Sequence, residues 1–499
     1  MISALNSKTS KQNHILVVNS YPSDLHLSWS LEFVADTINT NSKAMVHFVD
    51  LSMSSYSNEL SFKSEIKNRL LRFPKNRKVH GCLKIITKKN QLLIHKTKFR
   101  FSLSIFLKSV KYFLNIYRYK NLYEMINNGN VNLLMNSLHS SMANKYKTVF
   151  YSIRAHPLAT ILRVYSFLIS QKITRCIIGK NKLITNVYVG NGRFPNSAGV
   201  IAACQEIGVK VSFLERGGVP GTFEVFTISP HSIKERRREA DRIWDLFDKN
   251  LVNLREKIAI SYFDSRRFYD VYAGFNWSNQ HKKNIVLEIK SNYPGKKICA
   301  FFSSTELEIP VIKDLENSNY FKNQAEALEA LLKQLDPSEW IILLRRHPYH
   351  KNFRRDPERL LWERCIQYSN LIVLDPDSLV DSYSLLKESD LVCHFNSSIG
   401  PESIYYGARH TITFGNTFWD LEEIPFTVRN NEQLLKTIKF VENEIKANSS
   451  TSHNRYDAAM KWALYMSVSG KPFKIVEWFK GRANFKTLEN SRNLLDKKT

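Results

Sequence analysis

The residues best suited to chemistry in this chain stand in a short loop between an apolar strand and a helix, near residue 400. Ser397 and Ser398 offer hydroxyl groups there, and Gly400 leaves the backbone open to a ligand. Hydroxyls and free backbone N–H groups at the start of a helix favour phosphate, because that end of a helix carries a partial positive charge. The pattern therefore predicts a turn that holds a diphosphate or a nucleotide monophosphate. A strand-to-helix turn that is merely capped by serine would show the same residues.

The apolar pattern predicts the elements on either side of this turn. A continuous apolar run indicates a buried strand over residues 390–395. Proline is favoured at the first helical position and glycine just after a helix, so we expect the helix to begin at Pro401 and to stop at Gly407.

A second turn follows the predicted parallel strand over residues 340–346, which ends in two arginines. Open α/β sheets bind ligands at the carboxyl ends of their strands. His347 can donate a hydrogen bond to a phosphate there, and Arg345 or Arg346 can supply positive charge. Pro348 fixes the turn and removes a competing backbone donor. We therefore expect this turn, too, to contact a phosphate.

The two turns in this order resemble the nucleotide-sugar half of bacterial surface-carbohydrate glycosyltransferases, the group that contains capsule Kdo transferases and bacterial sialyltransferases. The likeness rests on the segments RRHP, LIVLDPDS and SSIGPESIYYG within residues 298–416. In that group a His-Pro turn and a serine pair hold the phosphate of a CMP-sugar, and a glutamate on the following helix often binds the ribose. The resemblance implies phosphate contacts at His347, Ser397 and Ser398, and a ribose contact at Glu402.

The resemblance also implies the GT-B architecture, an α/β fold in which two Rossmann-like, doubly wound domains face a cleft. Alternating strands and helices along the chain favour this fold, because such alternation builds parallel sheets. We expect an N-terminal acceptor-side domain over residues 1–280 and a C-terminal nucleotide-sugar-binding domain over residues 281–450. A last segment, residues 451–499, has a helical pattern from Arg455 to Phe479 and by resemblance packs back on the first domain.

A glycosyl transfer also needs a base for the acceptor hydroxyl. The clearest β-α-β pattern in the N-terminal half has strands that should end at Val189 and Leu214. If those strands are neighbours, the residues that follow them share one rim of the sheet. Glu215 is the leading candidate base, while an ion pair with a nearby arginine is the competing interpretation and Asp24 and His156 are alternative bases. The other acceptor-side residues at this rim are Asn191, Arg193 and Arg216.

The net charge is +26, and most of it is local. Between Ser61 and Lys120 there are 17 Lys or Arg residues and a single acid, Glu65. The segment 101–120 interleaves aromatic and aliphatic residues with basic ones, which predicts a basic amphipathic helix. Such a helix suits the anionic inner face of the cytoplasmic membrane. A solvated basic face is the alternative, and nucleic-acid binding is not expected because no nucleic-acid motif accompanies the charge.

Composition narrows the class of protein further. With 499 residues, 43% hydrophobic and 24% charged, the chain is expected to fold into more than one domain. Six scattered cysteines argue against a zinc site or a disulfide framework and favour a reducing compartment. No signal peptide is apparent and no uncharged run approaches the ~20 residues that cross a bilayer, so we expect a cytoplasmic, membrane-peripheral protein. No carboxylate pair has metal-binding spacing, and no metal or cofactor is expected.

Three functions follow from these observations. The favoured one is a glycosyltransferase of capsule or lipopolysaccharide synthesis that moves a sugar to a growing polysaccharide or glycolipid. A CMP-activated donor such as Kdo or sialic acid is favoured. A nucleotide-sugar epimerase of GT-B architecture would share the phosphate turns but would not need the basic surface. A non-catalytic carbohydrate- or lipid-binding relative would keep the fold and lose the base. The sequence leaves open the donor, the acceptor and whether the anomeric configuration is retained.

Overall fold

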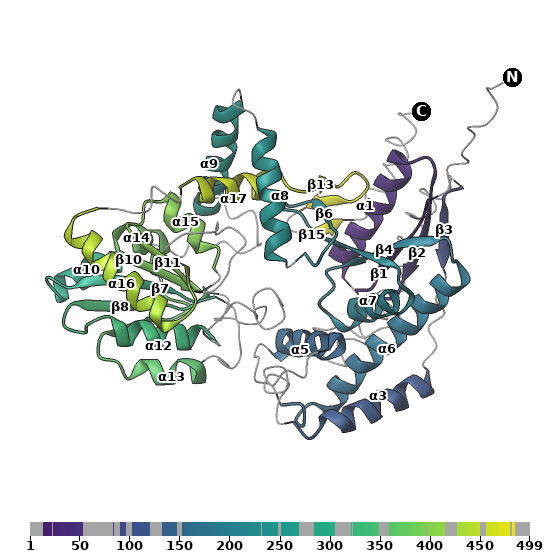
Figure 1. The fold of residues 1–499 in the computed structure, drawn as a ribbon, viewed down its shortest axis with the longest axis horizontal. Helices are drawn as coiled ribbons and strands as arrows, with labels where there is room; N and C mark the ends of the chain where they lie inside the picture. Colours follow the sequence, from purple (N-terminus) through teal and green to yellow (C-terminus); the bar gives the residue numbers. More distant parts are fainter. Residues whose placement is uncertain are drawn as a thin grey trace.

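Two mostly parallel β-sheets with helices on their faces form the frame of the molecule (Figure 1). The structure, a computed structural model, describes residues 13–21, 23–52, 83, 90–95, 102–119, 132–146, 152–230, 232–247, 251–268, 284–304, 321, 323–348, 359–395, 397–414, 427–449, 456–479 and 482–484. The prediction of an α/β fold with two Rossmann-like units is confirmed by these sheets. The predicted domain boundary near residue 280 lies outside the described residues, as does most of the basic block 61–120.

The first sheet has the strand order β13-β6-β5-β4-β1-β2-β3. The pairs β5-β6 and β6-β13 are antiparallel, and the other neighbours are parallel. The run β3-β2-β1-β4-β5 is the order of a doubly wound fold, in which the chain changes direction across the sheet between β1 and β4. Its strands are β1 (Asn13–Asn19), β2 (Ala44–Asp50), β3 (Leu92–His95), β4 (Ile184–Gly190), β5 (Lys210–Arg216), β6 (Thr222–Phe226) and β13 (Lys471–Pro472).

Both faces of the first sheet are buried. Successive strand residues point to opposite sides, so each strand contributes side chains to both faces. Val17 and Phe48 pack toward α1, whereas Leu16 and Val187 pack toward α6 and α7. Ser23 caps α1 by accepting a hydrogen bond from the N–H of Leu25. The helices of this unit are α1 (Asp24–Thr40), α3 (Leu103–Ile116), α5 (Leu133–Tyr146), α6 (Pro157–Lys180) and α7 (Pro195–Ile207).

The second sheet has the order β12-β11-β10-β7-β8-β9, and all its neighbours are parallel. This is again the doubly wound order, with the change of direction between β7 and β10. Its strands are β7 (Lys297–Phe302), β8 (Trp340–Arg345), β9 (Leu371–Leu374), β10 (Leu391–Phe395), β11 (Thr411–Phe414) and β12 (Thr427–Val428). Its helices are α10 (Ile285–Asn292), α12 (Gln324–Gln334), α13 (Arg359–Ile366), α14 (Ser382–Glu388), α15 (Ile399–Tyr405) and α16 (Asn431–Lys446).

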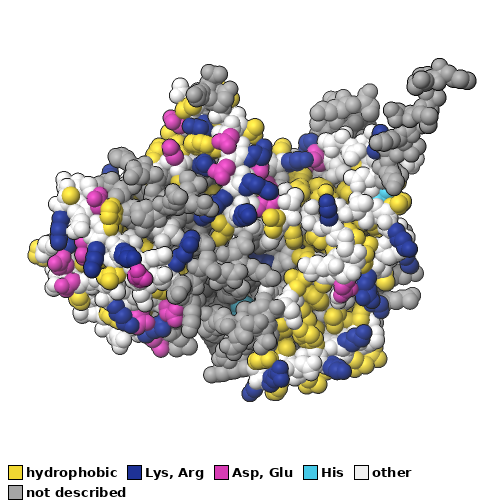
Figure 2. All heavy atoms as spheres, in the orientation of Figure 1, with side chains coloured by type: hydrophobic (Ala, Val, Ile, Leu, Met, Phe, Trp, Pro, Cys, Tyr) yellow, Lys and Arg dark blue, Asp and Glu magenta, His cyan; other side chains and the backbone are white. Residues whose placement is uncertain are grey.

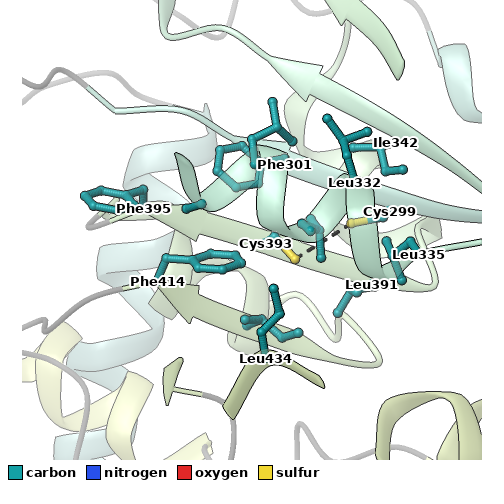
Figure 3. Close-up of a cluster of buried hydrophobic side chains, with 14 of the residues drawn as sticks. Cys299, Phe301, Leu332, Leu335, Ile342, Leu391, Cys393, Phe395, Phe414 and Leu434 are labelled. Atoms are coloured by element: carbon teal, nitrogen blue, oxygen red, sulfur yellow. Dashed lines mark hydrogen bonds between the residues drawn. The ribbon is translucent and has the colours of Figure 1, made fainter. Parts of the chain in front are cut away.

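A core of buried hydrophobic side chains lies between the second sheet and helices α12 and α16 (Figure 3). The Phe301 and Phe414 rings lie 5.8 Å apart between centroids. The Cys299 and Cys393 sulfurs, on adjacent strands, lie 3.7 Å apart, and all five described cysteines are free thiols. This packing holds β7 and β10 together, and therefore fixes the loops that leave their carboxyl ends.

Three further helices connect the two sheets at the top of Figure 1: α8 (Ile233–Leu246), α9 (Val252–Phe268) and α17 (Tyr456–Val468). Helix α17 packs on α8, α9 and α15 through a buried cluster that includes Phe263, Ile404 and Trp462. None of the described helices is both long and apolar enough to span a bilayer.

The chain returns to the first sheet after α17. Strand β13 pairs with β6, and a short hairpin of β14 (Glu477–Phe479) and β15 (Arg482–Asn484) follows. The prediction of a helix through Phe479 is therefore wrong beyond Val468. Gly470 has φ +97°, a left-handed value that ends the helix, and Pro472 cannot continue it.

A buried carboxylate on α1 holds this returning segment. Glu32 is 1% exposed, and its two oxygens accept hydrogen bonds from three consecutive backbone N–H groups. The donors are Lys474 at 2.8 Å, Ile475 at 2.8 Å and Val476 at 2.6 Å. One side chain of the N-terminal unit thus fixes a turn more than four hundred residues away in the sequence.

Replacing Glu32 by Ala should leave these three N–H groups, those of Ile475 and Val476 in buried residues, without an acceptor. We expect the free energy of unfolding to fall by about 2–4 kcal/mol, measured by chemical denaturation. Glu206→Ala is the matched control, because that carboxylate is 44% exposed and pairs with Arg175 at the surface. The control should lower the free energy of unfolding by no more than about 0.5 kcal/mol. Equal losses in the two variants would contradict the role of Glu32 in holding the returning segment.

Candidate functional site

The predicted donor residues lie at the carboxyl edge of the second sheet, where the strand order changes direction. Strand β7 lies between β8 and β10, so the His-Pro turn and the Ser-Ser turn are two inter-strand spacings apart, about 10 Å. The backbone N–H of His347 donates to Ser303 Oγ at 2.9 Å, which joins the end of β8 to the end of β7. Ligands of doubly wound sheets bind at this switch point. The structure therefore brings both predicted turns to one candidate site.

The two arginines before His347 have different surroundings. Arg345 is 3% exposed and donates to the backbone oxygens of Asp375 at 2.7 Å and Ser378 at 3.4 Å, which ties β8 to the loop after β9. Burial lowers the pKa of Arg345 to about 10. The Arg346 guanidinium lies 3.7 Å from the Asp375 carboxylate, which is 70% exposed. Arg345 therefore has a structural role, whereas Arg346, itself only 8% exposed, faces the exposed Asp375 carboxylate.

Helix α15 begins at Ile399, two residues before the predicted start at Pro401. A proline is tolerated throughout the first turn, because the N–H groups there have no partner within the helix. Gly400 is accordingly inside the helix, and its N–H donates to the backbone oxygen of Ser397 at 3.1 Å. Ser397 Oγ accepts from the N–H of Ile399 at 3.3 Å. The predicted stop is confirmed, since Gly407 has φ +80° just after the helix.

Ser398 and Glu402 are joined by an arginine that the sequence analysis missed. The Arg266 guanidinium, from the last turn of α9, donates through Nε to Glu402 Oε1 at 2.7 Å and through Nη2 to Ser398 Oγ at 3.2 Å. Burial acts to lower the pKa of Arg266, but the Glu402 charge raises it above its usual value. A charged helix with Arg266 and Arg267 at its end gives no sequence signal that one arginine has a partner 136 residues away.

Both oxygens of Glu402 already have protein partners. The second, Oε2, accepts from the Tyr383 hydroxyl at 2.9 Å, and the Glu402 side chain is 4% exposed. Burial and the Glu402 charge raise the pKa of Tyr383 well above its usual range, so this hydroxyl keeps its proton. Tyr383 also lines a polar cavity of about 290 Å³, together with Arg267, Lys387 and Tyr406 among other residues. The ribose contact implied by the resemblance would need one Glu402 oxygen to change partner.

The predicted acceptor-side residues also share a rim. Strands β4 and β5 pair in parallel, and Asn191 Nδ2 donates to Glu215 Oε2 at 2.6 Å. The other oxygen, Oε1, accepts from the backbone N–H of Arg216 at 3.0 Å. The strand runs through Arg216 rather than ending at Leu214, because β6 pairs with these residues in a hairpin. Among the described residues Glu215 forms no ion pair with Arg193 or Arg216, so an amide rather than a guanidinium holds this carboxylate.

A second titratable group at this rim was also missed. His26, in the first turn of α1, stacks on Tyr21 with centroids 4.2 Å apart and lies against Gly190 at the end of β4. Burial, with the nearby Arg193 charge, lowers the pKa of His26 to about 3, so the imidazole is neutral at neutral pH. The alternative base Asp24 begins the same helix.

His156, the other alternative base, lies at the start of α6, where it stacks on Tyr146 at 3.8 Å. Burial and the neighbouring Lys145 and Arg163 charges lower its pKa. Among the residues that the structure describes, no group of three or more His, Cys, Asp or Glu side chains could hold a metal ion.

Asn191→Asp should test how Glu215 is held. Asn191 has φ +58°, a left-handed conformation that Asp also tolerates, so the backbone should survive. Two carboxylates 2.6 Å apart cannot both ionise cheaply, so the folded-state pKa of one of them should rise. We expect the free energy of unfolding to be about 1–3 kcal/mol lower at pH 7.5 and to approach the wild-type value near pH 4–5, because the raised pKa destabilises only above the unfolded-state pKa.

Asn448→Asp is the matched control, since Asn448 also has a positive φ, +51°, but is exposed. Its effect on the free energy of unfolding should be small across this pH range. A pH-independent loss in Asn191→Asp, measured by denaturation at several pH values, would contradict the contact.

No protein-family model matches the chain, and no curated protein sequence matches it. Solved structures that match include the beta Kdo 2,4 transferase KpsC of Thermosulfurimonas dismutans, at 13% identity over 51% of this chain and 79% of that chain, with a TM-score of 0.32. UDP-GlcNAc 2-epimerase of Methanocaldococcus jannaschii matches at 11% identity over 97% and 99%, with a TM-score of 0.27. The α,α-trehalose 6-phosphate synthase of Burkholderia multivorans matches at 9% identity over 91% and 96%, with a TM-score of 0.34. A transferase, an epimerase and a synthase thus all occur among these matches.

Proposed function

We propose that the protein is a glycosyltransferase that takes its sugar from a nucleotide-sugar, with a CMP-activated donor such as Kdo or sialic acid favoured. One observation carries this proposal. The His347 turn and the Ser397-Ser398 turn lie on either side of β7, at the switch point of the second sheet, with Arg266 in contact with Ser398. Hydroxyls and guanidinium groups at such an edge suit the phosphate of a nucleotide.

The chemistry of the reaction assigns a role to each rim. The bond from the sugar's anomeric carbon to the phosphate oxygen breaks, and the nucleotide leaves with the electron pair. His347, Ser397, Ser398 and Arg346 would stabilise the negative charge that grows on the departing phosphate. On the acceptor side, Glu215 would take the proton of the attacking hydroxyl. Its hydrogen bond from Asn191 Nδ2 orients the carboxylate for that task.

The acceptor is proposed to be a glycan or glycolipid at the inner face of the cytoplasmic membrane. Helix α3 buries Ile105, Phe113 and Ile116 and leaves an outer face of leucines next to basic residues. On that outer face Leu103 is 63% exposed, Leu107 58% and Leu114 63%. Exposed leucines flanked by lysines are what an anionic membrane surface binds. The basic residues of this face are Lys108, Lys111 and Arg118.

The sequence around α3 carries almost only positive charge over a long stretch. Between Glu65 and Glu206 the chain has a single acid, Glu124, and 25 Lys or Arg residues. Basic and apolar side chains lie side by side over the lower part of the right-hand lobe in Figure 2, where Figure 1 has α3 and α6, whereas acidic side chains gather on the left-hand lobe and the connecting helices. A nucleotide-sugar epimerase would share the donor rim but would have no use for this surface.

Glu215→Gln keeps the shape of the side chain and removes the base. With CMP-Kdo, CMP-sialic acid and UDP-sugars tested side by side, we expect nucleotide binding to persist while sugar transfer falls by about 10²- to 10⁴-fold. Glu206→Gln, at an exposed carboxylate of the same unit, should retain transfer. Wild-type formation of an epimer without transfer would replace the proposed activity by the epimerase alternative. Transfer at the wild-type rate in Glu215→Gln would remove Glu215 as the base and direct the search to His26, Asp24 and His156.

Vesicle binding tests the membrane surface. Changing Leu103, Leu107 and Leu114 together to Ser should weaken co-sedimentation with phosphatidylglycerol vesicles by about 10-fold or more, because each buried leucine contributes on the order of 1 kcal/mol or more. Raising the salt concentration should also weaken binding, since it screens the basic residues.

The matched control is a triple variant at three leucines that are about equally exposed but lie outside α3. Leu183 is 65% exposed, Leu246 62% and Leu287 61%. Changing these three to Ser should leave vesicle binding intact. Equal binding of the wild type to neutral phosphatidylcholine vesicles would contradict an electrostatic membrane surface.

A further inference from the structure

We propose that Arg266 belongs to the donor site, where it exchanges the Glu402 carboxylate for the phosphate of the nucleotide and thereby frees Glu402 Oε1 for the ribose. This inference rests on the proposed function and extends it to a residue outside both predicted turns. It makes helix α9, which comes before the second sheet in the sequence, a part of the nucleotide site.

The contact geometry carries the first step. Arg266 reaches Ser398 Oγ through Nη2 at 3.2 Å and Glu402 Oε1 through Nε at 2.7 Å. A guanidinium group has five N–H donors in a planar fork, which matches a phosphate as well as a carboxylate. Because Ser398 follows β10 at the switch point, a phosphate bound to its hydroxyl would lie within reach of the same guanidinium.

The exposed fractions of the two side chains indicate which of them an incoming phosphate would reach first. The Arg266 side chain is 28% exposed, whereas that of Glu402 is 4% exposed. The pair is therefore open to solvent on the arginine side and closed on the carboxylate side. An anion that arrives from solvent meets Arg266 first, and the buried carboxylate cannot follow the arginine outward because Tyr383 holds its other oxygen at 2.9 Å.

The charges favour replacement of Glu402 by a phosphate as the partner of Arg266. A buried ion pair of one cation and one carboxylate gains little net stability, because desolvation offsets the Coulomb attraction. A phosphate group carries more negative charge than a carboxylate and competes for the same donors. Once Arg266 turns to the phosphate, Glu402 keeps the Tyr383 hydrogen bond and has Oε1 available to accept from a ribose hydroxyl.

The phosphate increment tests this exchange. We define it as the affinity of a nucleoside monophosphate divided by that of its nucleoside, with CMP against cytidine and UMP against uridine, measured by calorimetry on the full chain. Contacts to the base cancel in this ratio, whereas the Glu402 contact to the ribose, which the exchange makes available, is counted together with the phosphate. Arg266→Met should lower the increment by about 10- to 100-fold, the size expected for a lost charge-assisted hydrogen bond to phosphate.

Three further variants distinguish a lost phosphate contact from a folding defect. Arg266→Met alone leaves a buried charge without a partner, so the double variant Arg266→Met with Glu402→Gln removes both charges and should show the same loss of increment. Glu402→Gln alone should retain or increase it, because Arg266 is then no longer neutralised. Lys257→Met, at an exposed lysine on the same helix, should leave the increment unchanged.

The outcomes separate this inference from the proposed function. A wild-type protein that binds no nucleotide removes both. A wild-type protein with a clear phosphate increment that stays the same in Arg266→Met and in the double variant overturns the inference alone, and assigns Arg266 to the folding of α9 against α15. An increment that falls in Glu402→Gln as much as in Arg266→Met also overturns it, because the carboxylate would then support the phosphate contact instead of competing with it.

Discussion

The apolar cluster between α8, α9, α15 and α17 is the interaction on which the candidate donor site depends. Phe263 of α9 stacks on Tyr405 of α15 with ring centroids 4.1 Å apart, and the buried Trp462 and Tyr465 of α17 complete the cluster. Burial of large aromatic side chains contributes most of the stability in such contacts. Because this packing fixes the end of α9 against α15, Arg266 meets Glu402 and Ser398. A helix that precedes the second sheet thereby supplies a charged group to its carboxyl edge.

The same cluster starts the return of the chain to its first sheet. Helix α17 passes from α15 to β13, and Glu32 then holds the following turn by three backbone hydrogen bonds. The Ser469 hydroxyl accepts from the N–H of Gly218 at 3.0 Å, close to the end of β5. The candidate donor rim and the candidate acceptor rim are therefore connected by one continuous run of packed and hydrogen-bonded residues.

The two rims differ in the kind of polar group that they offer. At the second sheet, serine hydroxyls, Arg346 and Arg266 surround the switch point, which suits an anionic leaving group. At the first sheet, the Glu215 carboxylate is held by an amide and a backbone N–H, and no ion pair to it is formed in the part of the chain that the structure describes. A carboxylate paired with arginine would be a weaker base, because the cation stabilises its charged form. The pairing with Asn191 is thus in keeping with the base that we propose at Glu215.

Local pattern in the sequence determined most of the elements. The strands around His347 and Ser397, the amphipathic helix α3 and the stop at Gly407 follow from hydrophobic periodicity and from the conformations of proline and glycine, which act over a few residues. The shared rim of β4 and β5 could also be predicted, because a β-α-β unit places its strands in parallel. Tertiary structure decided the partners: Asn191 for Glu215, Glu32 for the returning C-terminal turn, and Arg266 for Glu402 across 136 residues. Those contacts depend on how helices pack in space, and no local pattern in the sequence records that.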